Sequence, residues 1–150
     1  TDESIFLQSW YQELIGGYQN DSIETARLIN PEIRKQMEGM RAEKVIGSSL
    51  DAEVDIYCVD EVYQSLAKLG DELRFVFITS YARIHPISEQ VAGCVEAGEG
   101  VMLKVSKSEF DKCVRCWHHR EDVGSYDEHP ELCGRCVENV SGDGEQRHYA

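Results

Sequence analysis

The spacing of four cysteines constrains the fold of this 150-residue chain more than any other feature. Cys113 and Cys116 form one Cys-x-x-Cys pair, and Cys133 and Cys136 form a second pair after sixteen intervening residues. Each pair can bring two sulfurs within reach of one ion, and four thiolates around Zn²⁺ make the usual tetrahedral structural site. We therefore predict one structural zinc ion held by these four residues. Gly134 is free to adopt a positive φ in the second turn.

Other uses of these cysteines fit the sequence less well. The start, TDESIFLQSW, lacks a secretory signal and two cysteines are left over, which disfavours disulfides. A redox Cys-x-x-Cys pair should lie at the start of a helix after a strand, as in a thioredoxin-like unit, and would not need a second Cys-x-x-Cys pair. Catalytic zinc needs an open coordination position, which four cysteine ligands do not leave. Iron in place of zinc remains a chemical alternative. Four basic residues adjoin the ligands and would offset the formal −2 charge of a Zn(Cys)₄ site: Lys112, Arg115, Arg120 and Arg135.

The charge of the whole chain sets a second limit. Its net charge of −13 argues against a general nucleic-acid binder, because such affinity comes mainly from basic groups that release phosphate counterions. A local patch could still contact RNA. No apolar run approaches the length of a membrane span, so we expect no membrane partner and a cytoplasmic, monomeric protein. Because the chain does not begin with Met, we expect a piece of a longer protein whose active site lies elsewhere.

Hydrophobic patterning before the cysteines predicts an α+β domain. Ile29, Ile33, Met37 and Met40 recur at helical spacing within residues 22–46, where Pro31 leaves open whether the helix is continuous or restarts. Beyond this helix, the patterns predict a strand with one buried face, a short amphipathic helix, a strand covered on both faces, a loop excursion and a third strand. In that order, the residues are 53–59, 60–70, 73–80, 81–99 and 100–106. Cys58, on the inward face of the first strand, should be a buried free thiol.

Three stretches in this order resemble the C-terminal end of bacterial isoleucyl-tRNA synthetase, a class I aminoacyl-tRNA synthetase. They are RAEKVIGSSLDAEV, LGDELRFVFITS and KCVRCWHH with HPELCGRCVENVSGDGE. The resemblance implies that residues 1–47 end a helical anticodon-binding domain, 48–108 form a connecting α+β subdomain and 109–150 form a zinc domain. The resemblance also implies that the same four cysteines are the zinc ligands and that isoleucine tRNA is the partner. ATP, isoleucine and all catalytic residues would belong to upstream domains of the same chain.

Several residues have the chemistry to touch an unstacked anticodon or its phosphates. They are Arg41, Lys44, Arg115, Trp117, His118, His119, Arg120, Arg135 and Arg147. Trp117 could instead fill the zinc domain's small core, and we expect His118 and His119 to be more exposed than Trp117. His129 could be a spare zinc ligand.

Basic residues also recur along the first helix, at Arg27, Arg34 and Arg41, with Lys44 just beyond. They could form a phosphate-facing stripe. The reading we favour is a solvated face, with Glu24 and Glu38 each three residues before an arginine.

Other functions stay open at this point. A DNA-directed finger, like that of formamidopyrimidine-type DNA glycosylases, uses similar zinc knuckles, and a protein-interaction zinc ribbon is a third alternative. The letters KVSKS at 104–108 are similar to the K-M-S-K-S loop of class I synthetase ATP sites. No nucleotide-binding motif precedes them, so we interpret Lys104 and Lys107 as solvated residues at the end of a strand.

Overall fold

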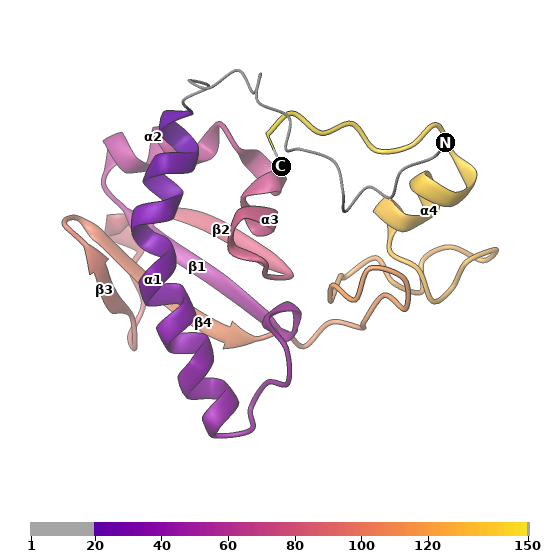
Figure 1. The fold of residues 1–150 in the computed structure, drawn as a ribbon, viewed down its shortest axis with the longest axis horizontal. Coiled ribbons are helices and arrows are strands. Elements are labelled where there is room, and N and C mark those ends of the chain that lie inside the picture. Colours follow the sequence, from indigo (N-terminus) through magenta and orange to yellow (C-terminus); the bar gives the residue numbers. More distant parts are fainter. Residues whose placement is uncertain (1–19, 150) are drawn as a thin grey trace, which may run out of the picture.

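Helices cover one four-stranded sheet in the computed structural model, which describes residues 20–149 (Figure 1). The α+β class is as predicted. The helices are α1 (Asp21–Ala42), α2 (Asp60–Ala67), α3 (Leu73–Phe77) and α4 (Gly134–Ser141). The strands are β1 (Ala52–Cys58), β2 (Tyr81–Pro86), β3 (Val95–Gly98) and β4 (Val101–Lys107). Their order is β2-β1-β4-β3, with β1 parallel to β2 and antiparallel to β4.

Helix α1 is continuous through Pro31, which settles the alternative left open by the sequence. Asn20 caps it, its side chain accepting the Ser22 amide at 3.0 Å. A proline inside a helix costs about 3 kcal/mol. The buried stripe of α1 outweighs that cost, because each large buried apolar side chain contributes about 1.5–3 kcal/mol. That stripe comprises Ala26, Ile29, Ile33 and Met37.

Strand β1 is the centre of the sheet and is buried on both faces. Cys58 is a buried free thiol, as predicted, and faces the helices with Val54 and Ile56. On the opposite face, the buried Glu53 carboxylate accepts from Ser108 Oγ at 2.5 Å and pairs with Arg83 at 2.6 Å. The prediction of one buried face is therefore wrong. Polar side chains from neighbouring segments close the second face.

Residues 73–80 do not form a strand. Leu73 and Phe77, four residues apart, are both buried on one side of α3, and Ile78 ends the helix in a left-handed conformation (φ 58°). Short apolar runs suit a buried strand and a buried helix equally, because periodicity cannot separate them at this length.

The supposed loop at 81–99 contains two strands, so the sheet has four strands instead of three. In β2, Ala82 and Ile84 pack against the apolar core. Arg83 and His85 reach acids of β1, and His85 Nε2 lies 2.8 Å from Asp55 Oδ1. These two contacts join residues thirty positions apart, which a local pattern cannot show.

After β4 the chain leaves the sheet and forms what we call the cysteine module, residues 109–149. Figure 1 shows this segment in orange and yellow beside residues 20–108, which we call the sheet unit, with α4 at its far side and the last residues returning toward α3. Glu72 holds that return by accepting the backbone amides of His148 and Tyr149, each at 2.6 Å. Among the helices of residues 20–149, none has the length and apolar character needed to span a bilayer.

Candidate metal centre and nucleic-acid interface

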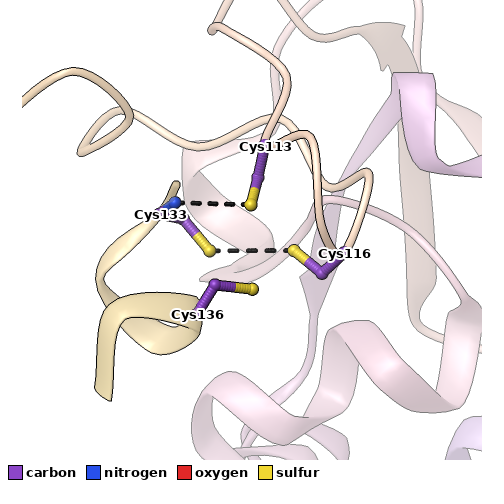
Figure 2. A group of neighbouring side chains, drawn as sticks. All are labelled: Cys113, Cys116, Cys133 and Cys136. Atoms are coloured by element: carbon purple, nitrogen blue, oxygen red, sulfur yellow. Dashed lines mark hydrogen bonds between the residues drawn. The ribbon is translucent and has the colours of Figure 1, made fainter. Parts of the chain in front are cut away.

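The four sulfurs of the two Cys-x-x-Cys pairs converge on one point (Figure 2). All lie within 4.8 Å of one another, and Sγ of Cys116 and Sγ of Cys133 are 3.7 Å apart. Zn–S bonds of about 2.3 Å in a tetrahedron give sulfur–sulfur edges of about 3.8 Å. The donor set and its geometry therefore fit the predicted zinc ion.

Local backbone structure presents these thiols. In the first knuckle, the Trp117 amide donates to the Cys113 carbonyl and the Cys113 amide donates to the His118 carbonyl, each at 2.9 Å. In the second, Cys133 precedes α4 and its amide donates to Cys113 Sγ at 3.4 Å. The amide hydrogen bond thus joins the two knuckles directly.

Gly134 does not adopt the positive φ that the sequence suggested; instead it lies close to two neighbouring side chains. The left-handed residue of the knuckles is Trp117, with φ 66°. A Cβ at Gly134 would lie 2.5 Å from the Tyr126 hydroxyl and 2.7 Å from Asp122 Oδ2, which accepts the Gly134 amide at 2.8 Å. A side chain at this position would therefore require the ends of Tyr126 and Asp122 to move, and the Asp122 carboxylate would have to leave the Gly134 amide.

The pKa shifts in the cluster favour the thiolate at Cys116 and the protonated thiol at Cys133 and, because of burial, at Cys136. A hydrogen bond from Cys133 holds the pKa of Cys116 far below its ordinary value, and the same bond raises the pKa of Cys133. Arg115 Nη1 lies 3.6 Å from Cys136 Sγ. Burial opposes the charge of Arg135, yet its bond to Cys116 and the nearby Glu145 raise its pKa. Two of the four predicted cations thus contact sulfur.

The other two cations contact aromatic rings. Lys112 Nζ lies 5.3 Å from the centre of the Trp117 ring, and the Arg120 guanidinium stacks at 4.1 Å on Tyr81. Arg120 also pairs with Asp71 at 3.5 Å, so it joins the cysteine module to the sheet unit.

Trp117 projects from the tip of the first knuckle. Its side chain is 60% exposed, so the alternative in which it fills the module's core is wrong. It holds a left-handed backbone conformation that is costly for a bulky residue. Arg115, two residues earlier, is also exposed. The knuckle thus presents an exposed ring, while the Arg115 guanidinium contacts the sulfur cluster.

The expected exposure of His118 and His119 is wrong. His118 is only 7% exposed and meets the Phe75 ring edge-on at 5.7 Å. His119 is half-buried: its amide donates to Ser80 Oγ at 2.6 Å, and its Nε2 lies 3.3 Å from Asp51 Oδ1. Both face the sheet unit, because the antiparallel bridge between Lys112 and His119 turns this segment back toward it.

His129 stands apart from the sulfur cluster. Its Nε2 lies 2.9 Å from Ser141 Oγ, and the cluster within residues 20–149 comprises the four cysteines alone. The spare-ligand alternative therefore has no support in the geometry.

Sequence reasoning missed Phe75, the residue on which the cysteine module docks. Guanidinium groups of Arg74 and Arg147 each lie 4.1 Å from its ring centre, and that of Arg135 lies at 5.2 Å. Arg135 also pairs with Glu145 at 2.8 Å. Arg135 thus links the sulfur cluster, the tail and α3. A phenylalanine in an apolar run gives no local signal of such a role.

The basic residues of α1 lie at a different place. Arg27 and Arg41 pair with Glu24 and Glu38, the arrangement expected of a solvated face. Arg41 and Lys44 instead line a hollow at the end of α1. The structure therefore gathers seven of the nine predicted RNA-contacting residues in or beside the cysteine module and leaves these two apart.

Comparison with known proteins agrees with this geometry. Residues 110–139 match the family described as a zinc finger found in FPG and IleRS. The chain is 63% identical over 98% of its length to an isoleucine–tRNA ligase of Ruthia magnifica. It is 51% identical over 99% of its length to that of Nitrosococcus oceani, and 47% over 99% to that of Pseudomonas paraeruginosa. The chain spans about 16% of the length of each of these curated relatives. In sequence, then, the chain matches the C-terminal region of isoleucine–tRNA ligases and carries, in its cysteine module, the zinc finger found in FPG and IleRS.

Proposed function

We propose that this chain is the anticodon-side tRNA-binding region of an isoleucine–tRNA ligase of the cytoplasm. It holds no active site of its own. Upstream domains of the same polypeptide bind ATP and isoleucine and perform aminoacylation, while this region positions isoleucine tRNA so that its acceptor end reaches them. Similarity to isoleucine–tRNA ligases over almost the whole chain supports this role.

The observation that carries the proposal is the exposed Trp117 at the tip of the sulfur cluster. Unstacked anticodon bases bind to aromatic faces, each base–aromatic contact contributing about 1–3 kcal/mol. Lys112 lies beside the ring, and Arg115 is exposed two residues before it; both supply charge for nearby phosphates. His118 and His119 act inside the protein as packing and docking residues.

Zinc serves this role structurally. A bound Zn²⁺ would fasten the first knuckle to the start of α4, and four cysteine ligands leave no open position for water. Arg115 and Arg135 offset the negative charge of the thiolates. The protein's own contribution is thus to hold the knuckle that presents Trp117.

Charging of isoleucine tRNA by the parent ligase tests the proposal. We expect Cys113→Ser to lose zinc and charging activity together, and Trp117→Ala to raise the KM for tRNA while zinc is retained. Cys94→Ser, a half-buried thiol outside the cluster, is the matched control. Full charging by a zinc-free Cys113→Ser enzyme would refute the role.

A competition experiment separates the other readings. The family model also covers FPG, so duplex DNA is the appropriate rival ligand. Labelled isoleucine tRNA should be displaced by unlabelled tRNA and resist duplex DNA. Displacement by DNA at equal concentration would favour a DNA-directed finger. Absence of any salt-sensitive tRNA binding would favour a protein-interaction ribbon.

A further inference from the structure

A basic hollow lies at the end of α1, separate from the sulfur cluster. Its volume is about 500 Å³. The lining residues are Arg41, Lys44, Val45, Ile46, Gly47, Asp51 and Lys107. Three of them are cations in a chain of net charge −13. We propose that this hollow binds a phosphodiester of the RNA backbone, as a second tRNA contact; this inference rests on the proposed function.

The single carboxylate of the hollow is already occupied. Asp51 Oδ2 accepts the amides of Gly47 and Ser48 at 2.8 and 2.9 Å, and Asp51 Oδ1 lies 3.3 Å from His119 Nε2. These bonds hold the carboxylate against its own loop. Asp51 is therefore engaged by the loop amides and the imidazole. It pairs with neither lysine of the hollow, so it competes little with a phosphate for their ammonium groups.

The two lysines are the available cations. Arg41 is engaged by Glu38 and by Ser49 Oγ, the latter at 2.6 Å. Within residues 20–149, neither Lys44 nor Lys107 has an ion pair or a side-chain hydrogen bond, and both are exposed. Strand alternation places Lys107 on the same face of β4 as the buried Leu103 and Lys104 on the opposite face. Only Lys107 can therefore meet Lys44.

Lys44 occupies a position that suits glycine better. It follows the last turn of α1 with φ 59°, its amide donating to Arg41 O at 3.0 Å and the Val45 amide donating to Met40 O at 2.8 Å. This is a Schellman-type helix end, whose left-handed residue is usually glycine because a Cβ is strained there. Lysine therefore adds strain at this helix end, and the same turn brings its exposed side chain to the hollow.

Two further features bear on an anion here. The C-terminal dipole of α1 opposes it, and Arg41 in the last turn offsets that dipole. The hollow is also tied to the cysteine module, because His119 contacts Asp51 through its ring and Ser80 through its amide. A phosphate at the hollow and a base at Trp117 would therefore be held at a fixed separation.

The test measures how tRNA affinity depends on salt for the zinc-loaded chain, using an isoleucine tRNA transcript. We compare Lys44→Gly, Lys107→Ser and the control Lys104→Ser. Each lost phosphate contact should lower the slope of log K against log salt by about one. The affinity deficit of each variant relative to wild type should therefore be about eightfold larger at 0.1 M salt than at 1 M. Lys44→Gly should melt no lower than wild type, and Lys104→Ser should bind like wild type.

The outcomes separate this inference from the proposed function. Wild-type slopes for Lys44→Gly and Lys107→Ser, while Trp117→Ala still weakens binding, would overturn the hollow alone. Equal weakening by Lys104→Ser would show a general charge effect and would also overturn it. If the wild-type chain showed no salt-dependent tRNA binding, the proposed function would fall, and this inference with it.

Discussion

Removing zinc should unfold the cysteine module and leave the sheet unit folded. The buried hydrophobic set of the module consists of Cys113, Cys133 and Cys136, with Cys116, Val123 and Leu132 partly buried around them. Full burial of Val123 and Leu132 would contribute only about 3–6 kcal/mol. Ordering even ten backbone residues costs about 10–20 kcal/mol. Structural zinc supplies about 10–16 kcal/mol, so the metal is the dominant stabilising term.

Hydrogen–deuterium exchange before and after chelation measures this separation. The amides of Trp117 and Val137, which close the knuckle and start α4, should lose their protection. Those of Ile56 and Leu103, paired across β1 and β4, should keep theirs. Cys113→Ser should reproduce the effect of chelation, whereas Cys94→Ser should behave like the zinc-loaded wild type.

The reasoning fails if Trp117 and Val137 stay protected in the chelated chain. Docking on Phe75 and Glu72 would then suffice to hold the module without metal. Collapse of the sheet unit on chelation would refute it equally, since the buried core of residues 26–103 contains none of the four ligands.

Three further predictions follow from individual contacts. Phe75→Ala should destabilise the zinc-loaded chain by about 2–4 kcal/mol in denaturant unfolding, because three guanidinium contacts of roughly 0.5–2 kcal/mol each are lost; Phe75→Trp should restore most of this. Arg135→Gln should weaken zinc binding about 10–100-fold in a chelator competition, with Arg27→Gln unchanged, because Arg135 supports a ligand sulfur. Burial favours protonation of Asp51, but the Ser48 and Gly47 amides and His119 hold its pKa below the ordinary 3.8. The stabilisation is therefore complete above pH 3.8 and lost as pH falls through the lowered pKa, so wild type and Asp51→Asn should converge in acid.

Local patterns predicted the parts of the molecule that depend on local chemistry. The cysteine spacing located the sulfur cluster, and the apolar period of α1 located its buried stripe. The sequence predicted burial of only one face of β1. The second face is covered by distant residues such as Ser108, which bonds Glu53 from fifty-five residues away. Helix α3 was misassigned because five residues are too few to show a period. As a result, the strand was predicted at 73–80, whereas the observed strand β2 begins at Tyr81 and is held by its pairing with β1.

The predicted RNA-contacting residues show the same difference between what local patterns reveal and what depends on distant contacts. Trp117 and His118 are adjacent, yet one points outward and the other packs on Phe75. Their order in the chain carries no information about which is which. The distinction depends on the left-handed backbone conformation of Trp117 and on the position of α3. The sequence CWHH predicts neither of them.

The docking of two arginines of the cysteine module, Arg135 and Arg147, on Phe75 bears on how this finger could be moved between proteins. A graft limited to residues 110–139 would carry Arg135 but leave behind Arg147, the Phe75 ring that both arginines contact, and Glu145, which pairs with both. Such a transplant could load metal and still swing freely on its new host. To fix the direction of the finger, the graft would have to extend to Tyr149, and the recipient would have to supply an aromatic ring in the place of Phe75 and an acid in the place of Glu72.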